Sequence, residues 1–111
     1  MAVGDRTEKR LAGPTQLGST TTTIGTVPAS RNWVIKQIII TNNDTIDRTL
    51  SLAIGTAATE ANRLMSTLPI GANDIMVFDT ALVLTAAETL QGLADTASKV
   101  NVTLVGWEKE V

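Results

Sequence analysis

Along most of the chain, apolar and polar positions alternate with a period of two residues. In residues 48–54, Leu50, Leu52 and Ile54 fall on one side of an extended chain, and smaller or polar residues fall on the other. Because successive side chains of a strand point to opposite faces of a sheet, this pattern predicts a strand with one buried face. Comparable runs bounded by Gly, Pro, Asn or Asp predict further strands at residues 20–27, 32–40, 63–70, 74–80, 81–84, 88–94 and 99–107.

The run NWVIKQIIITNND, residues 32–44, differs because it is apolar on both faces, with Ile39 on the side opposite Ile40. Lys36 and Gln37 lie in the middle of this run, one on each face. Their polar ends need water or a partner, because burying an unpaired amine or amide costs about 1–3 kcal/mol. We therefore expect a central strand whose second face is partly covered by the N-terminal segment or by another subunit.

Residues 1–18 show no sustained period and mix charged residues with Gly and Pro. They predict an extended N-terminal arm, and residues 19–111 predict a single β-sandwich domain. Such an arm is either a frayed terminus or an extended segment that lies on a neighbouring subunit. The arm residues that we expect at a subunit contact are Arg6, Lys9, Arg10 and Leu11.

Two segments have a helical alternative. Thr85 and Glu88 have the spacing of a helix capping box at the start of residues 85–97. Gly92 in the middle weakens such a helix, so a strand is preferred there. Residues 55–64 are expected to hold at most one helical turn before the next strand.

The length of 111 residues fits one domain with a single core. Apolar residues make up 43% of the chain and charged residues 18%, the composition of a globular rather than a disordered protein. Eighteen threonines favour pleated strands. The fold class that follows is all-β: an antiparallel sandwich of about eight strands, jelly-roll-like, with an extended N-terminal arm.

The charge balance argues against nucleic acid as a partner. Nine basic residues stand against eleven acidic ones, which gives a net charge of −2 and no cationic surface for a polyanion. One Phe and two Trp also offer few platforms on which bases could stack. The longest apolar run, residues 38–40, is too short to cross a bilayer, and the first ten residues lack the apolar segment of a secretion signal. We expect a soluble, unprocessed chain without a membrane partner.

The residue types needed for most catalytic sites are missing. The chain has no histidine and no cysteine, which excludes Ser-His-Asp and Cys-His systems, His- or Cys-ligated zinc, and disulfides. Asp74, Asp79 and Glu88 show no spacing that selects a catalytic carboxylate pair. The NNDTID loop, residues 42–47, lacks the central glycine and distal glutamate of an EF-hand, so a plain hairpin turn is preferred to a calcium site. No catalytic residue, cofactor or metal is predicted.

The two tryptophans and Lys36 are the remaining candidates for a contact surface. Trp107 shares the parity of Thr103 and Val105 in the last strand, which favours an outward position. It either covers the bottom of the sandwich or anchors a subunit contact, since buried tryptophans are enriched at interface hot spots. Trp33 has the same two interpretations.

Three stretches are similar to small virion structural proteins of tailed bacteriophages: RNWVIKQIIITNND, LSLAIGTAA and RLMSTLPIGANDIMVFDTALVLTAAETLQGLADTASKVNVTLVGWE. The shared pattern is a strand ending in Thr-Asn, an apolar strand ending in Gly, an LPI..N turn, an FDTPLVL-like segment, GDTLQG and a closing VNVTLxGxE strand. It covers roughly residues 31–108 and contains no catalytic signature. The chain departs from it at Ala81, where proline is common, and at Ala87-Glu88, where Gly-Asp is common.

The resemblance implies a β-sandwich that is exposed on a phage particle or built into it. It implies first a capsid decoration (cement) protein, which would bind the major capsid protein or other virion proteins as a homo-oligomer, with a trimer favoured. A tail, neck or adhesin component with a carbohydrate- or protein-binding sandwich is the open alternative, and an enzyme is least favoured. The expected location is the virion, in first place the capsid surface, after synthesis in the host cytoplasm.

Overall fold

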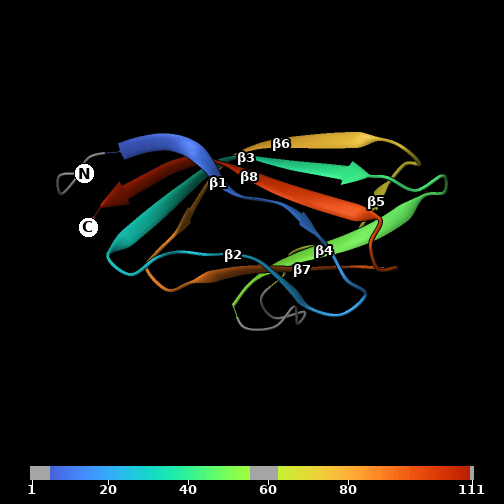
Figure 1. Ribbon diagram of the computed structural model, residues 1–111, viewed down its shortest axis with the longest axis horizontal. Coiled ribbons are helices and arrows are strands. Elements are labelled where there is room, and N and C mark those ends of the chain that lie inside the picture. The colour runs from blue at the N-terminus through green and yellow to red at the C-terminus, as the bar shows by residue number, and fades with distance from the viewer. Residues whose placement is uncertain (1–5, 56–62, 111) are drawn as a thin grey trace.

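The computed structural model describes residues 6–55 and 63–110, which form two four-stranded antiparallel sheets. Sheet A contains, in spatial order, β1 (Arg6–Gln16), β8 (Val100–Glu110), β3 (Arg31–Asn42) and β6 (Ile75–Leu84). Sheet B contains β2 (Thr22–Thr26), β7 (Thr89–Ala94), β4 (Arg48–Ile54) and β5 (Arg63–Ile70). Figure 1 shows the sheets stacked, with β3, β6 and β8 above β2, β4 and β7. The predicted all-β antiparallel sandwich is confirmed.

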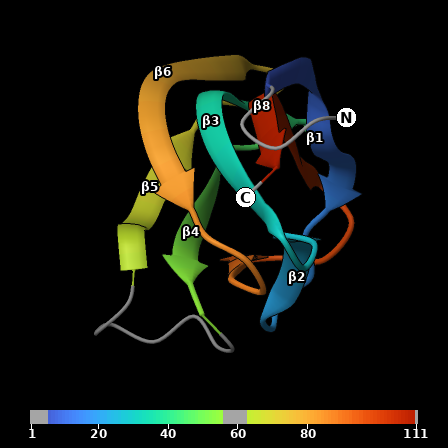
Figure 2. The ribbon, with the colours of Figure 1, turned by 90° about the vertical axis from the view of Figure 1, so that its left-hand side faces the viewer.

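Each strand of the first half of the chain pairs with a strand of the second half. β1 pairs with β8, β2 with β7, β3 with β6, and β4 with β5, all antiparallel. A long hairpin that folds over itself into two sheets gives this nested pairing, and the resulting strand order is that of a jelly roll. The edge strands β5 and β6 therefore follow each other along one side of the sandwich, away from β1 (Figure 2).

The core lies between the sheets and is filled by aliphatic side chains from both. Alternate residues of β8 enter it, beginning with Val100. The core is tightly filled at Gly92 of β7, since a Cβ there would lie 3.0 Å from side-chain atoms of Ile24 and Leu52 on the neighbouring strands β2 and β4. Burial of this apolar surface is the main stabilisation of a chain without disulfides. The fully enclosed leucines and isoleucines are Leu17, Ile35, Ile40, Leu50, Leu52, Ile70, Leu84, Leu90 and Leu104.

Most strands begin and end close to the positions that the sequence predicts. β4 and β5 occupy residues 48–54 and 63–70, as expected. β3 and β8 are longer than predicted because they pair with each other along their whole length, from Arg31 opposite Glu110 to Asn42 opposite Val100.

The runs expected as two strands at residues 74–80 and 81–84 form one strand, β6, which corrects that division. From Asp79 to Leu82, β6 advances three residues while its partner β3 advances two. This bulge places an extra residue where the resembling phage sequences commonly have proline, and the strand continues through it. The eighth strand of the sandwich is therefore β1.

β1 occupies most of the segment expected to be an N-terminal arm. Residues 6–16 are extended, and they pair with β8 with two register shifts. Leu11 and Leu17 are buried in the core of their own chain. β1 is therefore an edge strand of sheet A, since β8 is its only neighbour among the described strands of the sheet. The boundary expected at residue 18 falls between β1 and β2.

The preference for a strand within residues 85–97 is confirmed, because β7 lies there and no helix forms. The backbone N–H and the hydroxyl of Thr85 both donate to Oε1 of Glu88 at 2.7 Å, and the N–H of Glu88 donates back to the Thr85 carbonyl at 3.1 Å. Both hydrogen bonds from Thr85 lower the pKa of Glu88, and the bond from the backbone N–H has the larger effect. The capping-box spacing therefore closes a four-residue turn instead of starting a helix.

Ala87, the third residue of this turn, has a φ of 69°. A side chain disfavours that left-handed conformation, and the resembling phage sequences commonly have glycine at this position. Replacing Ala87 with glycine is expected to raise the free energy of unfolding by about 0.5–1 kcal/mol in urea denaturation. The control, Ala86→Gly in the same turn, should lower it, because there glycine only adds freedom to the unfolded chain. Equal losses in both variants would contradict strain at Ala87.

Residues 56–62, which include most of the segment expected to hold one helical turn, lie outside the described residues. Within the described part of the chain, no helix has the length and apolar character needed to span a membrane.

Candidate interaction surface

The face of sheet A that points away from sheet B carries apolar side chains from three strands. Ile75, Val77 and Val83 of β6 are 58%, 52% and 55% exposed there. The apolar second face expected for β3 is therefore real and continues onto its neighbours. This surface, called the outer face below, comprises Arg10 of β1, Val34, Lys36, Gln37 and Ile39 of β3, Ile75, Val77, Asp79 and Val83 of β6, and Val105 and Trp107 of β8.

Lys36 and Gln37 both lie on the outer face, which corrects the expectation of one on each face. Between Ile35 and Gln37, β3 advances two residues while β8 advances one, so Lys36 is the extra residue of a bulge. Its Nζ lies 5.5 Å from the ring centroid of Trp107, a cation–π contact worth about 0.5–1 kcal/mol at an exposed site. The Gln37 side-chain N–H donates to Oδ1 of Asp79 at 3.1 Å.

Gly106 is the residue of β8 beside this bulge. A Cβ at Gly106 would overlap the carbonyl oxygen of Val34 and lie 2.9 Å from the backbone nitrogen of Lys36. These are backbone atoms of a paired strand, so they cannot rotate aside. Gly106 therefore allows β3 to bulge, and the bulge places Lys36 over the ring of Trp107.

Glu108 joins three strands at one end of sheet A. Its Oε2 accepts a 3.0 Å hydrogen bond from the indole N–H of Trp33, and its Oε1 lies 3.2 Å from Nζ of Lys9 and 3.7 Å from Nε of Arg31. The pKa of Glu108 is held below its ordinary value of 4.5, mainly by the hydrogen bond from Trp33 and to a smaller extent by that from Lys9. Burial acts in the opposite direction and raises this pKa. The resulting stabilisation is fully present above pH 4.5 and is lost as the pH falls through the lowered pKa.

The loop at residues 42–47, considered above as a calcium loop, is closed by its own hydrogen bonds. Nε and Nη2 of Arg48 donate to Oδ2 of Asp44 at 2.9 and 2.6 Å. The hydrogen bonds from Arg48 lower the pKa of Asp44, and the hydrogen bond from the N–H of Thr45 lowers it further. The amide of Asn42 donates to three backbone carbonyls. In the described residues, no three Asp, Glu, His or Cys side chains are grouped so that they could hold a metal ion.

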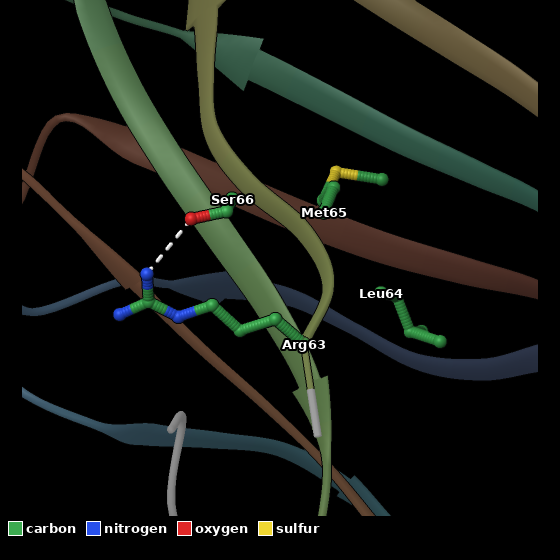
Figure 3. A pocket seen from close by; sticks show the side chains of 4 residues that line it. All are labelled: Arg63, Leu64, Met65 and Ser66. Atoms are coloured by element: carbon green, nitrogen blue, oxygen red, sulfur yellow. Dashed lines mark hydrogen bonds between the residues drawn. The ribbon is translucent and has the colours of Figure 1, made fainter. Parts of the chain in front are cut away.

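Two hollows border β5. Figure 3 shows the first, with Arg63 and Ser66 joined by a 2.8 Å hydrogen bond on one side of the strand, and Leu64 and Met65 on the other. It measures about 400 Å³ and has no acidic residue in its described lining. The second measures about 240 Å³, and its described lining includes one acidic residue. Among the described residues, neither lining contains a pair of carboxylates. The second hollow is lined by Ile38, Leu64, Met65, Phe78, Asp79, Thr80 and Leu82.

The residues expected at an interface fall in different settings. Leu11 and Trp33 are packed inside their own chain, at 9% and 4% exposure, and the backbone of Arg6 pairs with Lys109. Lys9 is exposed and contacts Glu108. The structure brings three of them together on the outer face: Arg10, Lys36 and Trp107. An interface role for any of these residues stays a prediction.

The exposed residues of β6, Ile75, Val77 and Val83, were not predicted as part of a surface. A signal for them was present, because the segment IMVFDTALVL is apolar at both odd and even positions, as β3 is. Two neighbouring strands with two apolar faces indicate a sheet whose outer side is also apolar.

The nested pairing and the apolar outer face define a jelly-roll sandwich without a recognised reaction centre in its described residues. No family model matches the chain, and no curated protein matches it. Among solved structures, it is similar to a chain of infectious bursal disease virus, Gx strain, at 12% identity and a TM-score of 0.48, covering 94% of this chain and 30% of that one. It is also similar to a pentameric capsid protein isolated from metagenomic phage sequences, at 15% identity and a TM-score of 0.33, covering 96% and 60%.

This chain therefore spans less than two thirds of either matched protein. With identities and TM-scores this low, neither likeness adds a functional conclusion to what the chain's own residues show.

Proposed function

We propose that this chain is a non-enzymatic structural protein of a bacteriophage virion, and specifically a capsid decoration (cement) protein. It stabilises the head by binding the lattice of the major capsid protein as a homo-oligomer, with a trimer favoured. The observation that carries this proposal is the outer face, where Ile75, Val77 and Val83 are more than half exposed. A rigid sheet with apolar side chains facing water gains stability when another protein surface covers it.

The residues that carry the phage resemblance support the proposal, because they act together in the fold. Asn42, from the Thr-Asn end of β3, donates hydrogen bonds to the carbonyls of Ile70 and Gly71 in the LPI..N turn. Asn73 of the same turn donates its N–H to the carbonyl of Asp44. Two motifs that are distant in the sequence therefore form one turn cluster, and the resembling sequences are expected to share it.

Purified particles of the phage that encodes this chain test the proposal. Mass spectrometry of gradient-purified particles is expected to detect the chain in many copies, and cryo-EM density that fits the sandwich is expected at regular positions on the head. Particles from a gene deletion should lose their DNA at a lower temperature than wild-type particles, and complementation with the gene should restore the wild-type value.

The position of the cryo-EM density also distinguishes a head protein from a component of the tail or neck. Density confined to the tail or neck would favour a tail, neck or adhesin component, and glycan binding that is lost in Trp107→Ala would favour a carbohydrate-binding sandwich. Absence of the chain from purified particles would contradict both versions.

A further inference from the structure

We propose that the outer face is a self-association surface, on which a second copy of this chain packs face to face about a twofold axis roughly parallel to the strands. This inference rests on the charges and apolar side chains of the outer face, so it does not depend on the proposed function.

One row of side chains across sheet A has opposite charges at its two ends. Arg10 of β1 pairs with Val105 of β8, Val105 pairs with Gln37 of β3, and Gln37 pairs with Asp79 of β6. Directly paired residues share a face of a sheet, so all four belong to the outer face. The row therefore begins with a cation at one edge strand and ends with an anion at the other.

A twofold axis parallel to the strands reverses the left-to-right order of this row. If the axis passes over the middle of the sheet, Arg10 of each copy faces Asp79 of the other, and the same contact occurs twice. The ends of the row are three strand spacings apart, about 14 Å, so each pair lies at the rim of the contact. The hydrogen bond from Gln37 already holds the Asp79 carboxylate in this row.

The two middle strands supply the apolar centre, because they lie under the twofold axis. Val34 of β3 pairs with Trp107 of β8, and Ile39 of β3 and Val105 of β8 lie further along the same strands. Val77 and Val83 of the edge strand β6, which are more than half exposed, extend this apolar surface toward the rim. An apolar centre with a polar rim is the usual composition of a protein interface.

A second copy fits this surface better than an unrelated partner because the charge pattern is complementary to itself. A different partner would need the reverse order of charges at the same spacing, and the chain provides that order under a twofold rotation. The contact is compatible with the proposed trimer, because it can join copies that belong to two different trimers.

Sedimentation equilibrium of the purified full chain tests the inference through a charge exchange. The wild-type protein is expected to have the mass of two chains, or of six if the trimer also forms. Arg10→Asp and Asp79→Arg should each raise the dissociation constant of the twofold contact by about tenfold or more, because like charges then face each other at both ends. The double variant R10D/D79R should return it to within about threefold of the wild-type value, as expected when opposite charges face each other again.

Two further variants complete the test. Ile39→Lys, on the middle strand β3, should abolish the association, because it places a charge in the apolar centre. Lys99→Glu, at an exposed residue before β8, should leave it unchanged. Thermal unfolding of each variant checks that the sandwich is intact.

Three results would overturn the inference: a monomer at all concentrations, an assembly whose mass none of the outer-face variants changes, or a double variant no stronger than the single ones. If the variants change binding to phage heads but not the mass in solution, the coat protein covers the outer face instead. That last result would contradict self-association while supporting the decoration role, so the two proposals can fail separately.

Discussion

Replacing Gly106 with alanine is expected to lower the free energy of unfolding by about 3 kcal/mol or more. The added methyl group would overlap the carbonyl oxygen of Val34 and would also lie 2.9 Å from the Lys36 nitrogen and 3.0 Å from Cα of Ile35. All three are backbone atoms in the centre of sheet A, so relief requires β3 and β8 to separate. Chemical denaturation followed by circular dichroism measures the loss.

Gly71→Ala is the matched control for Gly106→Ala. A Cβ at Gly71 would meet only side-chain atoms of Asp74, at 3.6 and 3.7 Å, which is ordinary contact. This variant should change the free energy of unfolding by no more than about 0.5 kcal/mol. If Gly106→Ala proved as stable as Gly71→Ala, the close approach of β3 and β8 at the bulge would be wrong.

The second large effect is expected at Asn42, which is 1% exposed. Its Nδ2 donates to the carbonyl oxygens of Ile46, Ile70 and Gly71 at 3.0, 3.2 and 3.1 Å, and its Oδ1 accepts the N–H of Asp44 at 2.9 Å. Asn42→Ala removes these partners and leaves buried polar groups unpaired. We expect a loss of about 2–4 kcal/mol in the free energy of unfolding, measured in the same way.

The neighbouring residue provides the control for this prediction. Asn43 is exposed, and its backbone N–H, which donates to the carbonyl of Lys99 at 2.8 Å, is kept in an alanine variant. Asn43→Ala should therefore change the stability by less than about 0.5 kcal/mol. Similar losses in the two variants would show that the loop does not depend on the buried amide.

Local periodicity predicted the strands that have one buried face and clear turn residues at both ends. β4 and β5 were located to the residue for this reason. β1 was not predicted as part of the sandwich, because Gly13 and Pro14 interrupt its pattern and Lys9 and Arg10 make it look like a solvated tail. An edge strand needs few inward apolar side chains, so the local pattern of β1 gives little signal. Its place in the sheet depends on pairing with β8, which is distant in the sequence.

Bulges set the limit of a parity argument. The two-residue period assigns Lys36 and Gln37 to opposite faces, but the extra residue in β3 brings both to the outer face. In β6, the sequence predicted two strands that meet after Thr80, and the structure has one strand with a bulge at that place. Each bulge depends on the partner strand, as the contact of Gly106 with the backbone of β3 shows, and a single strand's pattern does not contain that information.

The outer face was predictable only in part. The two apolar faces of β3 indicated that a surface needed a cover, and the parity of Trp107 indicated that it faces outward. That Arg10 and Asp79 belong to one row could not be known from the sequence, because three separate strand registers define the row.

The nested order of strands also affects how the protein is made. β8 lies between β1 and β3, so the strand that joins them leaves the ribosome after the other seven described strands of the sandwich. Until synthesis has passed residue 100, the two earlier strands have no native neighbour in common, and their backbone edges stay open to wrong pairing. Sheet A can therefore be completed only after the other seven strands have been synthesised, and such long-range pairing makes folding slow.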